Sequence, residues 1–205
     1  QDGRAPSEGD PRFHQQMVYA VAMTTIRTFE LATGRRVIWA PYITRDAQGV
    51  VHHQFVRRLR VYPHALREAN AYYSPQKKAL LFGYFRAPAS PDGMIPPGGT
   101  VFACLSHDII AHETTHALLD GMHRYFDEPS NPDVLAFHEA LADIVALLQH
   151  FTLPEVLRDQ IARTRGDLAR QESLLGELAV EFGRARGMNG ALRDAIGEYH
   201  ERDVD

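Results

Sequence analysis

The sequence has a single cysteine, no long apolar run and no large excess of either charge. Cys104 is alone among 205 residues, which excludes an intrachain disulfide, and its apolar neighbours predict a small buried side chain. Apolar stretches such as residues 144–148 fall far below the roughly 18 residues that span a bilayer, so we expect no membrane partner. The net charge is −4 and the basic cluster Arg57, Arg58 and Arg60 is short, so we interpret the cluster as a solvated face and expect no nucleic-acid partner.

The first residues are polar and rich in glycine and proline, without the apolar core of a signal peptide. We interpret residues 1–10 as a linker or disordered segment, and both a secreted and a cytoplasmic location stay open. Apolar residues then recur at three- and four-residue steps between Asp10, which suits an N-cap, and Gly34, which suits a helix stop. This pattern predicts a first amphipathic helix. Residues 36–85 change to β-branched and aromatic residues between turn signals, which predicts a small sheet.

Two further helices are predicted after residue 130. Asn131 and Pro132 form a strong helix start, and Pro154 is a stop, so one apolar helix is expected between them. Residues 155–182 show heptad spacing with two polar interruptions, which predicts a long C-terminal helix. That helix either lies against the domain or forms a self-association surface.

The expected fold class is α+β, with a small, mainly antiparallel sheet followed by helices that cross beneath its edge. The core is expected at residues 11–153 and a helical C-terminal extension at residues 154–205.

The strongest local pattern is His112-Glu113-Thr114-Thr115-His116, which lies in a segment that favours a buried helix. Residues four apart share one face of a helix, so both imidazoles can reach one Zn²⁺ at about 2.0–2.1 Å. Glu113 directly follows His112 on the helix, so its carboxylate lies near the metal without binding it. There it can act as general base toward a water that the metal activates. The pattern predicts a hydrolytic zinc site, although such short patterns also occur by chance in unrelated proteins.

A catalytic zinc needs three protein ligands, and the helix predicted after Asn131 offers His138, Glu139 and Asp143. If Glu139 binds the metal, Asp143 one turn along can accept the N–H of a ligand histidine and fix its tautomer. Adjacent residues on a helix point in different directions, so only one of His138 and Glu139 can face the metal. We favour Glu139 because that choice also gives Asp143 a role, and His138 is the competitor.

Other histidines are weaker candidates for metal ligands. His107 and His123 are more typical of polar surface or cap residues. His52 and His53 are neighbours in a strand-like run, where alternation sends their side chains to opposite faces. We expect no metal at these four positions.

The paired-histidine helix, followed by a helix reading Glu139-Ala140-Leu141-Ala142-Asp143, resembles the thermolysin-like metallopeptidases, whose pattern is His-Glu-x-x-His and then Glu-x-x-x-Asp. Asn70-Ala71-Tyr72-Tyr73 is similar to the edge strand with which that family binds the substrate backbone, and Leu81-Phe82-Gly83 to the strand after it. The resemblance implies a zincin-like fold, a Zn²⁺ cofactor and endopeptidase activity on a peptide or protein. It also implies substrate binding through Asn70, Ala71 and Tyr72.

The sequence departs from the family pattern in several places. The connection from His116 to Glu139 is a few residues longer, His138 replaces an asparagine, and Ala142 replaces a serine. The family also completes its cleft with a C-terminal helical domain, so we expect a catalytic-core fragment here. Residues 197–200 faintly resemble the segment with the family's oxyanion-stabilising histidine, which makes His200 an oxyanion candidate, with a frayed terminus as the alternative.

Two other functions stay open at this point. The chain could be a zinc-binding interaction domain or inactive peptidase fragment that lacks the C-terminal half of the cleft. It could also be a hydrolase that applies the same metal chemistry to a substrate other than a peptide.

Overall fold

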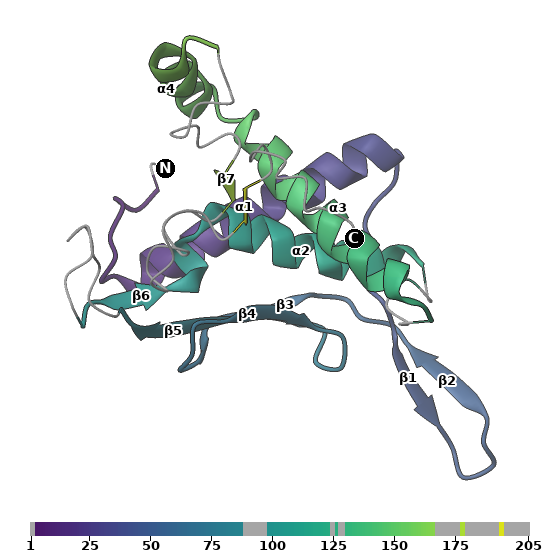
Figure 1. Ribbon diagram of the computed structural model, residues 1–205. Helices are drawn as coiled ribbons and strands as arrows, with labels where there is room; N and C mark the ends of the chain where they lie inside the picture. Colours follow the sequence, from purple (N-terminus) through teal and green to yellow (C-terminus); the bar gives the residue numbers. More distant parts are fainter. Residues whose placement is uncertain are drawn as a thin grey trace, which may run out of the picture.

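The computed structural model describes residues 3–87, 98–123, 126, 130–166, 177–178 and 193–194. Within these residues the fold is α+β, as the sequence predicts. The first two long helices lie on one face of a small sheet, and a two-stranded hairpin projects beyond the sheet (Figure 1). The core forms between the sheet and the first two helices.

The first helix, α1 (Pro11–Thr33), begins and ends where the sequence predicts. The side chain of Asp10 accepts a hydrogen bond from the backbone N–H of Arg12, which satisfies one of the donors left over at a helix start. Gly34 ends the helix at a φ of 66°, in the left-handed region that glycine adopts without steric cost.

The main sheet is small and mainly antiparallel, as expected. The central strand, β5, pairs in parallel with β3 on one side. On the other side β4 pairs antiparallel with the first half of β5, so β4 is an edge strand, and β6 pairs antiparallel with the end of β5. The separate hairpin of β1 and β2 is also antiparallel. The strands are β1 (Tyr42–Arg45), β2 (Val51–Gln54), β3 (Arg60–Leu66), β4 (Ala71–Ser74), β5 (Ala79–Arg86) and β6 (Thr100–Phe102).

After the sheet, a short 3-10 helix leads into two helices that pack side by side. The side chain of Ser106 caps α2, and the side chain of Asn131 accepts hydrogen bonds from two backbone N–H groups of α3. The predicted start of α3 at Asn131 is therefore confirmed. The elements are η1 (Ala103–Leu105), α2 (His107–Met122), α3 (Pro132–His150) and α4 (Pro154–Thr164).

The long helix predicted for residues 155–182 is not confirmed. α4 ends at Thr164, because Arg165 and Gly166 have φ values of 54° and 83°, a left-handed conformation that stops an α-helix. Further along, β7 (Glu177–Leu178) pairs with β8 (Arg193–Asp194) inside the predicted helix and extension. The rest of the heptad segment and the oxyanion candidate His200 lie outside the described residues.

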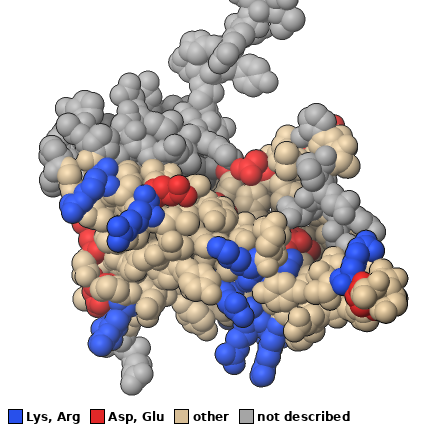
Figure 2. Space-filling model, turned by 90° about the horizontal axis from the view of Figure 1, so that it is seen from below, with Lys and Arg blue, Asp and Glu red and all other residues tan. Residues whose placement is uncertain are grey.

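The basic cluster of Arg57, Arg58 and Arg60 is exposed, which agrees with its interpretation as a solvated face. Seen from below the sheet, Lys and Arg side chains stand in separate groups, with Asp and Glu side chains among them (Figure 2). In the described part of the chain no single helix is long and apolar enough to cross a membrane, although α3 and α4, bent by 86°, meet that test as a pair.

Candidate metal centre

α2 positions the paired histidines at the border between the core and α3. Most residues of this helix are buried, and Thr114 and Thr115 satisfy their hydroxyls by donating to backbone carbonyls one turn back, at 2.6 and 2.9 Å. The side chains of His112 and His116 keep 15% of their surface exposed. Both imidazoles are therefore fixed by a buried helix yet can be reached from solvent.

Three side chains converge from α2 and α3. The Nε2 atoms of His112 and His116 are 3.0 Å apart, and the carboxylate oxygens of Glu139 lie 3.4 Å and 3.5 Å from them. Two nitrogen or oxygen ligands at about 2.0–2.1 Å from a tetrahedral zinc lie about 3.3 Å apart. The observed spacings are close to that value, so these three groups fit a zinc ion without rearrangement of either helix.

The second nitrogen of each histidine has its own partner. Nδ1 of His112 lies 2.9 Å from an Asp143 carboxylate oxygen, which fixes the tautomer that leaves Nε2 free to bind a metal. Nδ1 of His116 lies 3.2 Å from Nδ1 of His138, and the two rings stack with an interplanar angle of 10°. The structure thus brings Glu139 to the two Nε2 atoms and places the competitor His138 behind His116.

The two histidines differ in how easily they are protonated. Burial lowers the pKa of His112, but the hydrogen bond with Asp143 and the charges of Glu113, Asp143 and Glu139 outweigh it and raise the pKa overall. Burial and the neighbouring His112 lower the pKa of His116 to about 4. His116 is therefore neutral at physiological pH, as a zinc ligand must be.

Glu113 is held next to the three converging groups by the sheet. Its side chain is buried, and Oε2 accepts a hydrogen bond of 2.8 Å from the backbone N–H of Tyr73 on the edge strand β4. The hydroxyl of Tyr73 donates at 2.6 Å to Asp120, which also forms a buried ion pair of 2.9 Å with Lys78. The sequence analysis did not predict this Tyr73–Asp120–Lys78 network. Asp120, an acid within an apolar stretch of α2, was the feature of the sequence that could have indicated it.

The segment expected to bind a substrate backbone lies where the sequence predicts an edge strand. β4 starts at Ala71, whose backbone N–H donates to the side chain of the preceding Asn70 at 2.9 Å. Tyr72 pairs with Leu81 of β5. Gly83 of β5 approaches this turn so closely that a Cβ atom there would collide with the carbonyl of Asn70. The edge position is confirmed, and binding through Asn70, Ala71 and Tyr72 stays a prediction.

The weaker histidine candidates separate into two kinds. His123 closes α2, where its backbone N–H donates to Leu119, and His52 pairs with Asp46 on the exposed hairpin. His107, in contrast, is half-buried at the start of α2 and groups with Asp108 and His150 in a possible metal-ligand arrangement. His107 does lie at the start of a helix, and its grouping with Asp108 and His150 is a feature that the sequence did not predict.

Comparison with known proteins returns no match: no family model, no curated protein and no solved structure is similar to this chain. The function must therefore be argued from the geometry of the site and from the sequence motif.

Proposed function

We propose that this chain is a zinc-dependent endopeptidase of the thermolysin-like type. The observation that carries the proposal is the convergence of His112, His116 and Glu139 beside the buried carboxylate of Glu113. Two imidazoles and one carboxylate form a common ligand set of catalytic zinc sites, which leave one position open. Asp143 supports the proposal because it orients His112, as second partners of zinc-bound histidines do.

A zinc ion held by these ligands would supply Lewis-acid chemistry, because it polarises a carbonyl oxygen and lowers the pKa of water. The residue that handles the proton is Glu113. Its carboxylate accepts a proton from the attacking water and later delivers that proton to the leaving amine nitrogen. The hydrogen bond from Tyr73 N–H holds one carboxylate oxygen in place, so the proton acceptor is already oriented before substrate binds.

The edge strand β4 offers a place for an extended peptide next to Glu113. The backbone N–H of Tyr73 points from the outer edge of β4 toward that carboxylate. Backbone groups two residues apart in an antiparallel strand face the same side, so the carbonyl of Ala71 faces the same edge. A substrate added as another strand would run past Glu113, which supports cleavage within a chain. A hollow lined by Val134, Phe137 and His138 adjoins the site.

The test is replacement of Glu113 with Gln, which keeps the shape of the side chain and removes the base. Zinc content should stay at that of the wild type, whereas hydrolysis of a broad peptide library should fall by about 10²–10⁴-fold. Glu155→Gln on the exposed surface of α4 is the matched control and should change neither quantity. Unchanged hydrolysis in Glu113→Gln would sink the mechanism.

The wild-type protein separates the remaining alternatives. Zinc binding without cleavage of any peptide would favour a zinc-binding interaction domain. Cleavage of esters or other small substrates alone would favour a hydrolase of a different class.

A further inference from the structure

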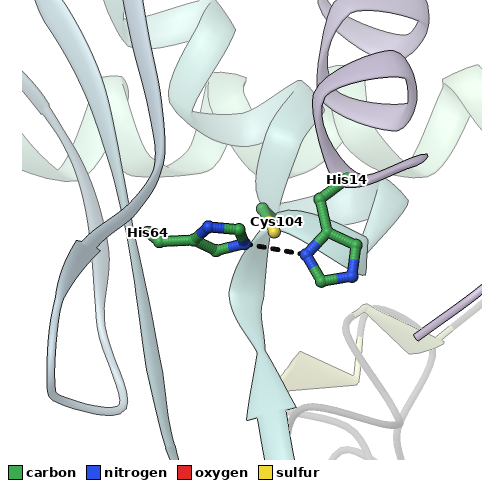
Figure 3. A group of neighbouring side chains, drawn as sticks. All are labelled: His14, His64 and Cys104. Carbon is green, nitrogen blue, oxygen red and sulfur yellow. Dashed lines mark hydrogen bonds between the residues drawn. The ribbon is translucent and has the colours of Figure 1, made fainter. Parts of the chain in front are cut away.

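A second group of metal-ligand side chains lies apart from the α2–α3 site. It consists of His14 from α1, His64 from β3 and Cys104 from η1 (Figure 3). One ligand atom from each residue, a ring nitrogen or the sulfur, lies within 4.8 Å of the other two. The proposed peptidase chemistry uses none of these residues.

His14 is buried and held in one tautomer. Its Nε2 lies 2.8 Å from the backbone carbonyl of Glu8, which can only accept a hydrogen bond, so Nε2 carries the proton. Nδ1 therefore presents a lone pair, and it faces Nε2 of His64 at 2.7 Å. A histidine that donates one N–H to a carbonyl and turns its other nitrogen inward has the arrangement of a metal ligand.

His64 reaches this point because β3 is irregular. The register of β3 against β5 shifts between Tyr62 and Leu66, and such bulges redirect side chains. Phe102 packs against both rings, with centroid distances of 4.6 Å to His14 and 5.3 Å to His64. The group therefore has an aromatic wall on one side, while His64 itself is exposed and gives access from solvent.

Cys104 supplies a soft ligand atom in the same place. It is fully buried and is the only cysteine in the chain. Burial raises the pKa of its thiol to about 12, so without a metal it is a neutral thiol. A bound metal reverses this preference, because a coordinated thiol loses its proton.

We propose that His14, His64 and Cys104 form a second metal site that binds Zn²⁺. Nitrogen and sulfur together suit zinc and its substitute Co²⁺ better than the oxygen-seeking ions Mg²⁺ and Ca²⁺. On binding, the S–H bond of Cys104 breaks, a sulfur–metal bond forms, and the proton passes to solvent. The proton on Nε2 of His64 moves through solvent to Nδ1, which frees Nε2 as a ligand. No electron is transferred, and a water on the exposed side completes four-coordination.

The experiment is titration of the metal-free full chain with Co²⁺, followed by absorption in the near ultraviolet. A sulfur-to-cobalt charge-transfer band can come only from Cys104, because the α2–α3 site contains no sulfur. The band should stop growing once one cobalt per chain is bound through Cys104, and the cobalt that the α2–α3 site takes up adds to the total required. The band should disappear when Zn²⁺ displaces the cobalt. This readout does not depend on the peptidase, so failure of either proposal can be recognised separately.

His64→Gln is the decisive variant, because an exposed side chain can be changed without opening the core. It should weaken cobalt binding, measured by the sulfur band, at least 10-fold while the circular dichroism spectrum stays the same. His53→Gln, at another exposed histidine on β2, is the matched control and should leave the band unchanged. Absence of the band in folded wild-type protein, or an unchanged band in His64→Gln, would overturn the proposal.

Discussion

Two of the possible metal-ligand groups, the α2–α3 group and the second group of His14, His64 and Cys104, are built in different ways. The α2–α3 group takes all its ligands from two adjacent helices, and its Nε2 atoms are already 3.0 Å apart. The second group joins a helix, a strand and a 3-10 helix, and its facing ring nitrogens are 2.7 Å apart, in hydrogen-bond contact. A tetrahedral metal needs about 3.3 Å between such atoms, so the second group must open further than the first to bind one.

Because of this difference, we expect metal binding to have different effects in the two groups. In the α2–α3 group, helix geometry sets the spacing of His112 and His116, so an ion would complete an arrangement of side chains that exists without it. In the second group, the ion would tie together three segments distant in sequence, so binding should stabilise the tertiary structure through its preference for the folded chain. We therefore expect the first group to serve the proposed chemistry on a bound molecule and the second to serve the stability of the fold.

The largest expected effect separates the two groups directly. Glu139→Ala removes one of three ligands from the α2–α3 group, so zinc affinity there should fall by more than the 10–100-fold that loss of a supporting residue costs. The sulfur band of cobalt at Cys104 should persist unchanged. Elemental analysis and cobalt titration of the same protein provide the two measurements. Loss of both signals in a folded variant would show that the groups are not independent.

The next largest effect concerns the buried Tyr73–Asp120–Lys78 network, which supports Glu113 beside the α2–α3 group. Asp120→Ala leaves the ammonium of Lys78 buried without its ion pair, and breaking such a pair costs about 3–5 kcal/mol in the free energy of unfolding. Urea denaturation measures the loss. The control is Asp159→Ala, whose ion pair with Arg163 is exposed, so the change should stay within about 1 kcal/mol.

Asp120→Ala also tests whether the α2–α3 group can be disturbed without the second group. The network holds Tyr73 and, through it, Glu113, whose charge acts on His112 of the α2–α3 group. In urea too dilute to unfold the whole protein, the variant should therefore lose the proposed peptidase activity while the cobalt–sulfur band remains. Equal loss of activity and band before global unfolding would contradict this separation.

The same difference explains how much of each site the sequence could predict. Helix geometry sets the spacing of His112 and His116, which are four residues apart. It also places Glu139 and Asp143 one turn apart on the helix that starts after Asn131. His14 and His64 are 50 residues apart and meet only after α1 packs on the sheet. No local spacing encodes that meeting, so sequence reasoning assigned Cys104 only a buried position.

Other predictions also succeeded where neighbouring residues determine the structure and failed where packing between distant segments determines it. The bounds of α1 depend on Asp10 and Gly34, which act on their immediate neighbours, and the structure has both as predicted. The long helix predicted from heptad spacing over residues 155–182 is not confirmed, because Arg165 and Gly166 end α4 at Thr164. The position of His138 behind His116 depends on how α3 packs against α2, which its neighbours in the sequence do not determine.

The smallest expected effect uses two matched helix caps. Asn131 caps α3, which carries Glu139, and Asp10 caps α1, which carries His14. Replacing either cap with Ala should cost about 1 kcal/mol in the free energy of unfolding, because one or two backbone N–H groups lose their acceptor. Urea denaturation should give similar losses for both variants.

The two cap variants should differ in which metal group they weaken. Asn131→Ala loosens the start of α3 and should reduce zinc affinity at the α2–α3 group by up to about fivefold, the equivalent of 1 kcal/mol. Asp10→Ala acts on α1 and on the segment that carries Glu8, whose carbonyl orients His14, so it should weaken the cobalt–sulfur band instead. Equal weakening of both groups by either cap would mean that the sheet and helices respond as one unit, and that local helix stability does not control either metal group.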